Sequence, residues 1–186
     1  MASGTTPFWI LPMQILATMA PCINFGGSVL HSPLIMPMLQ LPGIPILHTS
    51  RQNAYLLHSS EKFFPPLSFL SEFCNLALLL SSFLVRDADP QWADKSKLYA
   101  IALFFNLSTT FYALYIMVPH NRKIKALAKE LELRESTKSA DDEKMGEDEQ
   151  VVQMYRELQG FWIRNNYGRA SCMLSGAIVA MYALTS

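Results

Sequence analysis

The chain has 186 residues, which is enough for one domain. Fifteen basic residues balance fifteen acidic ones, which argues against a nucleic-acid-binding protein, because such proteins need a basic surface. Hydrophobic residues make up 51% of the chain and charged residues only 16%, against about a quarter in typical soluble domains. Residues 1–50 carry no Lys, Arg, Asp or Glu, whereas ten bases and ten acids lie between residues 120 and 169. We therefore expect an integral membrane protein in contact with the lipid bilayer, and we set aside a water-soluble enzyme.

Four apolar segments are candidates for membrane spans. About 20 apolar residues cross the 30 Å hydrocarbon core of a bilayer as a helix. The fourth apolar run is short, so its helix is expected to begin earlier, near Val151. The runs lack the alternation of a membrane β-barrel, which favours helices. We predict an all-α fold, a four-transmembrane-helix bundle forming one membrane domain over residues 1–186, with spans at about 7–38, 67–85, 98–118 and 162–185.

The connecting segments indicate an orientation. Segments 39–66 and 119–169 share one side of the membrane and hold twelve of the fifteen bases, so the positive-inside rule places them in the cytosol and both termini opposite. We expect short amphipathic helices in these loops, one at 49–63 and one from Val151 onward. The acidic stretch 138–150 is expected to be a flexible linker within the cytosolic loop 119–161. An endoplasmic reticulum or other endomembrane location is predicted.

Ionisable and amide side chains inside the predicted spans are candidate functional residues, because such groups are costly at membrane depth. Glu72 and Asn75 lie three residues apart on one face of the second span. Glu72 is either a general acid or base, or a hydrogen-bonded carboxyl that fixes helix packing. Asn24 and His31 are seven residues apart and share a face of the first span. His31 is either a proton carrier or a buried, hydrogen-bonded histidine.

Asn106 lies in the third span among other polar residues. Asn and Thr side chains in membrane helices more commonly link helices by hydrogen bonds than take part in chemistry. The three cysteines have no CxxC or Cys/His spacing, so neither a disulfide framework nor a metal site is expected. The sequence contains no nucleotide, flavin or haem motif, and we predict no cofactor. Any chemistry would then depend on acid–base side chains acting on an apolar substrate.

Local patterns at the ends of the cytosolic loop resemble a known family. The third span ends in ALYIMVPHNRKIKAL, and the fourth helix carries FWIRNNYGRASCMLSGAIVAM, with the spacing W-x3-N-x2-R at Trp162, Asn166 and Arg169. The first span ends in SVLHSPLIMPML. Together these segments resemble the anthrone oxygenase-like family of small four-helix membrane proteins.

This resemblance implies oxidation of anthrones to anthraquinones in polyketide secondary metabolism, without an assigned metal or organic cofactor. Asn121, Trp162, Asn166 and Arg169 match the family pattern, and Asn166 stands where many members carry His. Many members have no assigned reaction, so the fold alone does not fix the function.

We expect a base, His31 or Glu72, to remove a proton from an apolar aromatic substrate, whose carbanion then reacts with O2. In this hypothesis Arg169 and Asn121 stabilise the enolate oxygen and Trp162 stacks on the rings. Asn24, Asn75, Asn106 and Asn166 would complete the substrate site. A capping Asn, an interfacial Trp and a snorkelling Arg explain Asn121, Trp162 and Arg169 equally well. The alternatives are a membrane enzyme of non-oxidative cyclisation or isomerisation, and a non-catalytic small-molecule carrier or scaffold.

Overall fold

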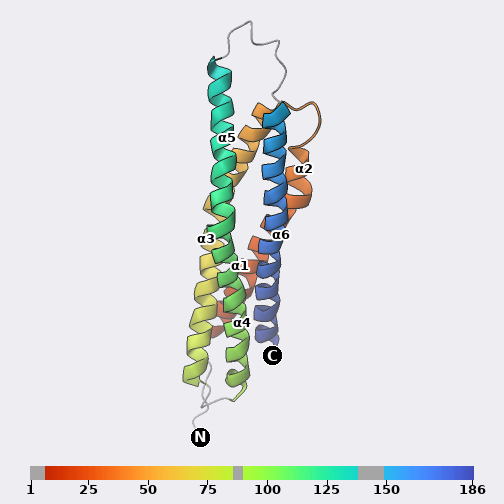
Figure 1. The fold of residues 1–186 in the computed structure, drawn as a ribbon. Coiled ribbons are helices and arrows are strands. Elements are labelled where there is room, and N and C mark those ends of the chain that lie inside the picture. Colours follow the sequence, from red (N-terminus) through yellow and green to blue (C-terminus); the bar gives the residue numbers. More distant parts are fainter. Residues whose placement is uncertain (1–6, 86–89, 138–148) are drawn as a thin grey trace. The chain divides into compact units, whose positions relative to one another are not determined.

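In a computed structural model of the protein, residues 7–85, 90–137 and 149–186 are described. All the regular structure in these ranges is helical, which confirms the predicted all-α class (Figure 1). The elements are α1 (Ile10–Leu30), the π-helical turn η1 (His31–Ile35), α2 (Met36–Met38), α3 (Ile46–Val85), α4 (Gln91–Tyr112), the π-helical turn η2 (Ala113–Met117), α5 (Val118–Thr137) and α6 (Glu149–Thr185).

Two of the predicted helix boundaries differ from the observed ones. The predicted loop helix at 49–63 and the second span form one helix, α3, with Pro65 and Pro66 inside it. A proline removes one backbone donor, but its fixed φ is compatible with a helix, so the flanking turns continue. The third span likewise continues through η2 into α5 as far as Thr137. Helix α6 begins at Glu149, close to the predicted Val151. All but the last two residues of the predicted linker 138–150 lie outside the described residues.

Within the described ranges, three helical stretches are long and apolar enough to cross a membrane: Ile10–Met38, Ile46–Val85 and Gln91–Thr137. They contain the first three predicted spans. The fourth predicted span lies in α6, which does not belong to this group. The composition of α6 explains the difference, because its uncharged run begins only after Arg169.

The chain divides into two compact units. Unit 1 comprises residues 1–27, 63–111 and 169–186, and unit 2 comprises 28–62 and 112–168. Each unit therefore takes a part of α1 or its continuation, a part of α3, the α4–α5 region and a part of α6.

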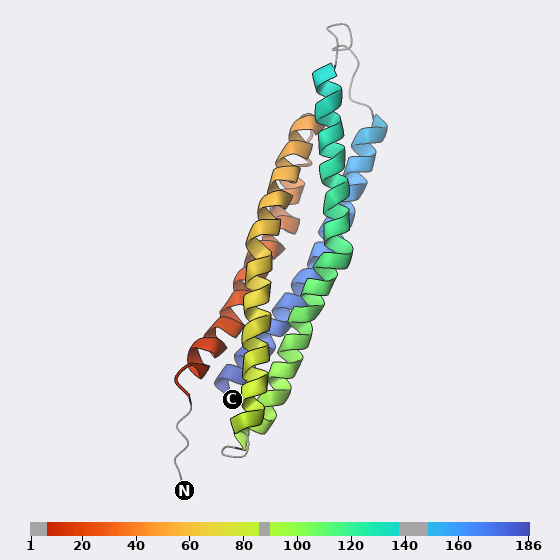
Figure 2. The same cartoon turned by 90° about the vertical axis from the view of Figure 1, so that its left-hand side faces the viewer.

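Unit 1 has a small apolar core and many exposed apolar side chains. Its buried cluster includes Leu78 of α3 and Tyr99 of α4, and the two helices run antiparallel (Figure 2). Phe69, Phe73 and Phe104 are each at least 60% exposed. Polar groups such as Ser71 and Asn75 are fully buried. This distribution is the reverse of a water-soluble bundle and is typical of helices whose outer faces contact lipid.

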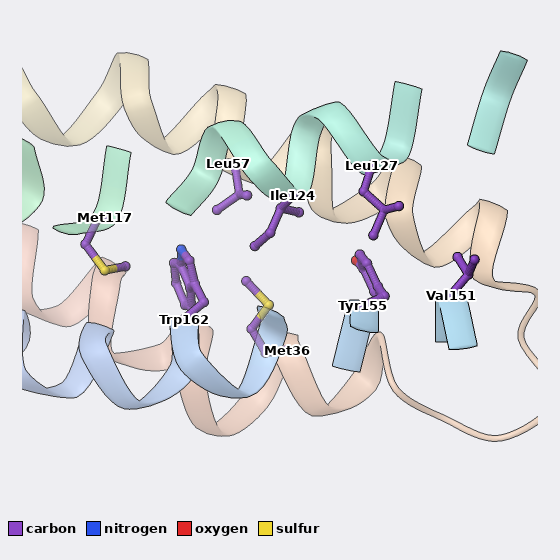
Figure 3. Packing of buried hydrophobic residues seen from close by; sticks show 8 residues of the cluster. All are labelled: Met36, Leu57, Met117, Ile124, Leu127, Val151, Tyr155 and Trp162. Carbon is purple, nitrogen blue, oxygen red and sulfur yellow. The ribbon is translucent and has the colours of Figure 1, made fainter. Parts of the chain in front are cut away.

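Unit 2 contains a longer apolar core. Ile124 and Leu127 of α5 point toward Tyr155 and Trp162 of α6 (Figure 3). Leu57 of α3 packs in the same cluster, together with Met36, Met117 and Val151. The cluster holds α3, α5 and α6 around the polar groups described below.

Candidate functional site

The nine predicted site residues fall into two sets, one in each unit. Unit 1 contains Asn24, Glu72, Asn75, Asn106 and Arg169, and unit 2 contains His31, Asn121, Trp162 and Asn166. Eight of the nine are buried, and Arg169 is partly exposed. The five that were chosen as polar residues inside the predicted spans are all among the buried ones.

In unit 1, Glu72 links α3 to α4. The hydroxyl of Thr110 donates a hydrogen bond to Oε1 of Glu72. One turn farther along α3, Nδ2 of Asn75 donates to the carbonyl of Ser71 at 2.9 Å. Oδ1 of Asn75 is buried and has no hydrogen-bond partner among the described residues. The face of α3 expected to be polar thus presents a carboxyl and an unpaired amide oxygen to the interior of unit 1.

Asn106 of α4 also carries an unpaired polar atom. Its Nδ2 is buried without a partner in the described part of the chain. The side chain lies against Gly176 of α6, where an added Cβ would stand 3.0 Å from Oδ1. Gly176 therefore gives the Asn106 amide the space it occupies.

Asn24 and Arg169 both meet the segment of α3 around Phe64. Nδ2 of Asn24 donates to Oγ of Ser68 at 2.8 Å and to the carbonyl of Phe64 at 3.4 Å. The guanidinium carbon of Arg169 lies 6.0 Å from the centre of the Phe64 ring, within range of a cation–π contact. Arg169 thus contacts an aromatic face in unit 1.

In unit 2, a chain of polar contacts begins at Trp162. Its Nε1 donates to Oδ1 of Asn121 at 2.9 Å, and Nδ2 of Asn121 donates to Oε1 of Glu61 at 3.0 Å. The ammonium of Lys125 pairs with the other oxygen of Glu61. Asn121 therefore joins α6 to α3 by its side chain. Glu61 and Lys125 were not predicted as site residues, because both lie outside the predicted spans, where charged residues are ordinary.

His31 and Asn166 both lie where α1 ends and η1 begins, Asn166 reaching this point from α6. His31 is the first residue of η1, and its ring centre is 6.3 Å from that of Trp162. Nδ2 of Asn166 donates to the carbonyl of Ser28 at 2.8 Å and to Oγ of Ser32 at 2.9 Å. Pro33 lacks the N–H that would pair with the carbonyl of the residue four positions earlier, which accounts for the wider π-helical turn here.

A second polar network in unit 2, centred on Tyr155, was not predicted from the sequence. The hydroxyl of Tyr155 accepts hydrogen bonds from Asn53 at 2.9 Å and from Gln159 at 3.2 Å, and donates to the carbonyl of Thr49 at 3.3 Å. Burial raises the pKa of Tyr155 to about 12. The apolar spacing placed Tyr155 on the packed face of its helix, but nothing in the pattern indicated its polar partners.

Among the residues that the structure describes, no three His, Cys, Asp or Glu side chains gather in a way that could hold a metal ion.

Comparison with known families shows to which family the chain belongs. The family model described as anthrone oxygenase matches residues 54–179, about two thirds of the sequence. The chain belongs to the anthrone oxygenase family. The match includes Glu72, Asn75 and Asn106, together with the W-x3-N-x2-R element and Asn121, whereas Asn24 and His31 precede it. None of the curated proteins and none of the solved structures matches the chain significantly.

Proposed function

We propose that this family member is an integral membrane oxygenase that converts an anthrone-type polyketide into an anthraquinone. Membership of the anthrone oxygenase family carries the proposal. The three apolar stretches and the exposed apolar side chains support a membrane setting, in which a flat, poorly soluble substrate would be concentrated. Residues 162–185 of α6 would be the fourth span, with segments 39–66 and 119–161 on the cytosolic side of an endomembrane.

The reaction can be balanced without a redox group on the protein. A base removes a proton from the methylene group opposite the ketone, which leaves a carbanion delocalised over the three rings. The carbanion passes one electron to O2, and the resulting radical and superoxide combine into a peroxide anion. This anion takes back the proton from the base and becomes a hydroperoxide. Loss of water from the hydroperoxide gives the second ketone. One anthrone and one O2 thus yield one anthraquinone and one water.

We assign the base to Glu72, because it lies within the family match and is a buried carboxyl in an apolar helix. Arg169, in the same unit, would stabilise the enolate oxygen through its positive charge. Asn75 and Asn106 would bind substrate oxygens, because each has an unpaired buried amide atom. Asn24 would hold α1 against α3 at this site through its bond to Ser68.

His31 is the competing base, in unit 2. It lies beside Trp162, and Asn121 is bonded to that indole. The amide of Asn121 keeps one N–H for an enolate oxygen beyond the one given to Glu61. Trp162 is packed inside the apolar cluster and Asn166 is bonded to α1 and η1, so we propose that both orient α6. Glu72 ranks before His31 because His31 lies outside the family match.

Two substitutions separate these assignments. Glu72→Gln keeps an oxygen that accepts the Thr110 hydroxyl, but it cannot take up a proton. We expect it to lower kcat for anthrone oxidation by about 100-fold or more, the usual size of a general-base contribution. His31→Gln is the matched variant and is expected to retain wild-type turnover. The measurement is O2 consumption by the purified protein in detergent, with thermal unfolding as the check on folding.

Each outcome has a definite meaning. A large loss in His31→Gln alone would transfer the base to unit 2, and wild-type rates in both folded variants would remove both residues from the mechanism. Wild-type protein that converts an added anthrone without consuming O2 would favour the non-oxidative alternative. Binding without any conversion would favour a carrier.

A further inference from the structure

Two buried amide side chains in unit 1, one on α3 and one on α4, suggest a binding site for one hydroxyl oxygen. Asn75 presents an unpaired acceptor, Oδ1, and Asn106 an unpaired donor, Nδ2. Both residues are at most 4% exposed. A buried polar atom without a partner costs about 1–3 kcal/mol, so two such atoms on neighbouring helices need an explanation.

The register of the two helices places both residues at one level. The bond between Thr110 and Glu72 fixes the pairing of the antiparallel helices α4 and α3 (Figure 2). Asn106 lies four residues before Thr110, a rise of about 6 Å, and Asn75 lies three residues after Glu72, a rise of about 4.5 Å in the same direction. Residues three and four apart share a helix face, so Asn106 lies on the face of α4 that carries Thr110, and Asn75 lies on the face of α3 that carries Glu72.

The chemistry of the two atoms selects the ligand. The amide of Asn75 cannot be reversed without loss of the bond from its Nδ2 to the carbonyl of Ser71, so oxygen is the atom it presents. A hydroxyl oxygen can donate to Asn75 and accept from Asn106 at the same time, whereas a ketone oxygen or an ammonium group could satisfy only one of them. Gly176 keeps the space beside Asn106 clear of a methyl group.

We propose that Asn75 and Asn106 bind a single hydroxyl oxygen, which donates its hydrogen to Oδ1 of Asn75 and accepts one from Nδ2 of Asn106. The oxygen belongs either to a phenolic hydroxyl of the substrate, an assignment that rests on the proposed function, or to a buried water molecule. In both cases the site lies one helical turn from Glu72.

Anaerobic binding distinguishes a substrate hydroxyl from water. Tryptophan fluorescence would measure the dissociation constants of anthrone and of its derivative with a hydroxyl on each side of the ketone. For a substrate hydroxyl, wild-type protein should bind the derivative about 10-fold more tightly, the value of one to two neutral hydrogen bonds. Asn75→Leu and Asn106→Leu should each bring this ratio close to one. Thr109→Val is the matched control, because that buried hydroxyl donates within α4, to the carbonyl of Phe105.

A crystal structure that resolves water decides the other case. Equal affinities for the two probes, with an ordered water within hydrogen-bond distance of both amides, would assign the oxygen to water. Equal affinities with Asn75 bonded directly to Asn106 would overturn the proposal, as would a ratio that both Leu variants retain. Binding is measured without O2, so it does not depend on the reaction. If wild-type protein prefers the hydroxylated derivative and both Leu variants lose this preference, but no oxygenation occurs when O2 is added, only the proposed reaction is refuted.

Discussion

Polar side chains in this protein mostly bridge helices. Asn121 is the clearest case, because its carbonyl accepts from Trp162 of α6 and its amide donates to Glu61 of α3. In a membrane, hydrophobic burial does little to bring one apolar helix to another, so such bonds and close packing set which faces meet. The buried amides of both units are therefore candidates for structural roles as well as for binding.

Tyr155 offers a stability test that depends on pH. Its pKa of about 12 in the folded protein exceeds the value near 10 of an exposed tyrosine, so folding favours the neutral phenol. The resulting stability is fully present below pH 10 and is lost as the pH rises from about 10 to 12. We expect the difference in unfolding free energy between wild-type protein and Tyr155→Phe to shrink by about 3 kcal/mol over that interval.

Denaturant unfolding in detergent, followed by circular dichroism at several pH values, would measure the difference. Tyr115→Phe is the control, because Tyr115 is 75% exposed and its removal should leave the pH dependence unchanged. A constant difference between wild-type protein and Tyr155→Phe up to pH 12 would show that the Tyr155 phenol ionises as easily in the folded state as in the unfolded one.

At the scale of single residues, the sequence predicts burial better than partnership. Glu72, Asn75 and Asn106 were selected as polar residues within apolar runs, and all three are buried. Their partners depend on which helices become neighbours and in what register, which a periodic pattern does not contain. The roles of Glu61 and Tyr155 were not predictable for a related reason, since Glu61 bonds to Asn121 and Tyr155 bonds to Asn53, in each case more than 50 positions away.

At the scale of elements, helix type was predictable and helix ends were not. The apolar period indicated helices, but the predicted loop helix at 49–63 and the span at 67–85 are one helix, α3, which continues through Pro65 and Pro66. In η1, by contrast, the proline accompanies a π-helical turn, and Asn166 donates to the nearby carbonyl of Ser28. Whether a proline interrupts a helix is thus decided by the tertiary partners of the carbonyls around it.

The approach of α1 to α3 in unit 1 depends on one of two adjacent glycines. A Cβ on Gly27 would lie 2.8 Å from Cε1 of Phe64, whereas a Cβ on Gly26 would meet nothing within 4 Å. Gly26→Ala should therefore stabilise the protein by up to about 1 kcal/mol through helix propensity. Gly27→Ala should be less stable than Gly26→Ala by about 1–3 kcal/mol, because the buried Phe64 ring must move.

The pair is internally controlled, since both variants add the same methyl group to the same helix. Thermal unfolding of both in detergent would give the comparison. Equal midpoints would mean that the Phe64 ring shifts at no cost and that Gly27 is not needed for the contact between α1 and α3.

At the scale of the whole molecule, segregation of charge is the feature that organises the chain. Residues 120–169 carry ten of the fifteen bases, and the apolar runs carry few charges. This uneven distribution of charge predicts both the position of the spans and their orientation. Three spans meet the requirement of length and hydropathy, and the fourth depends on α6, whose apolar run is the shortest. A topology experiment must therefore test the sides of the membrane on which the loops lie.

Two serines allow that test with matched chemistry. Ser96 of α4 lies between the second and third spans and Ser136 of α5 between the third and fourth, and each hydroxyl bonds the carbonyl three residues earlier in its own helix. With Cys22, Cys74 and Cys172 replaced by Ala, Ser96→Cys and Ser136→Cys would each supply one thiol. In sealed microsomes, whose outer face is cytosolic, we expect a membrane-impermeant maleimide to label Ser136→Cys at once and Ser96→Cys only after detergent is added. Immediate labelling of both would mean that residues 98–118 do not cross the bilayer, and the reverse pattern would invert the proposed orientation while preserving that span.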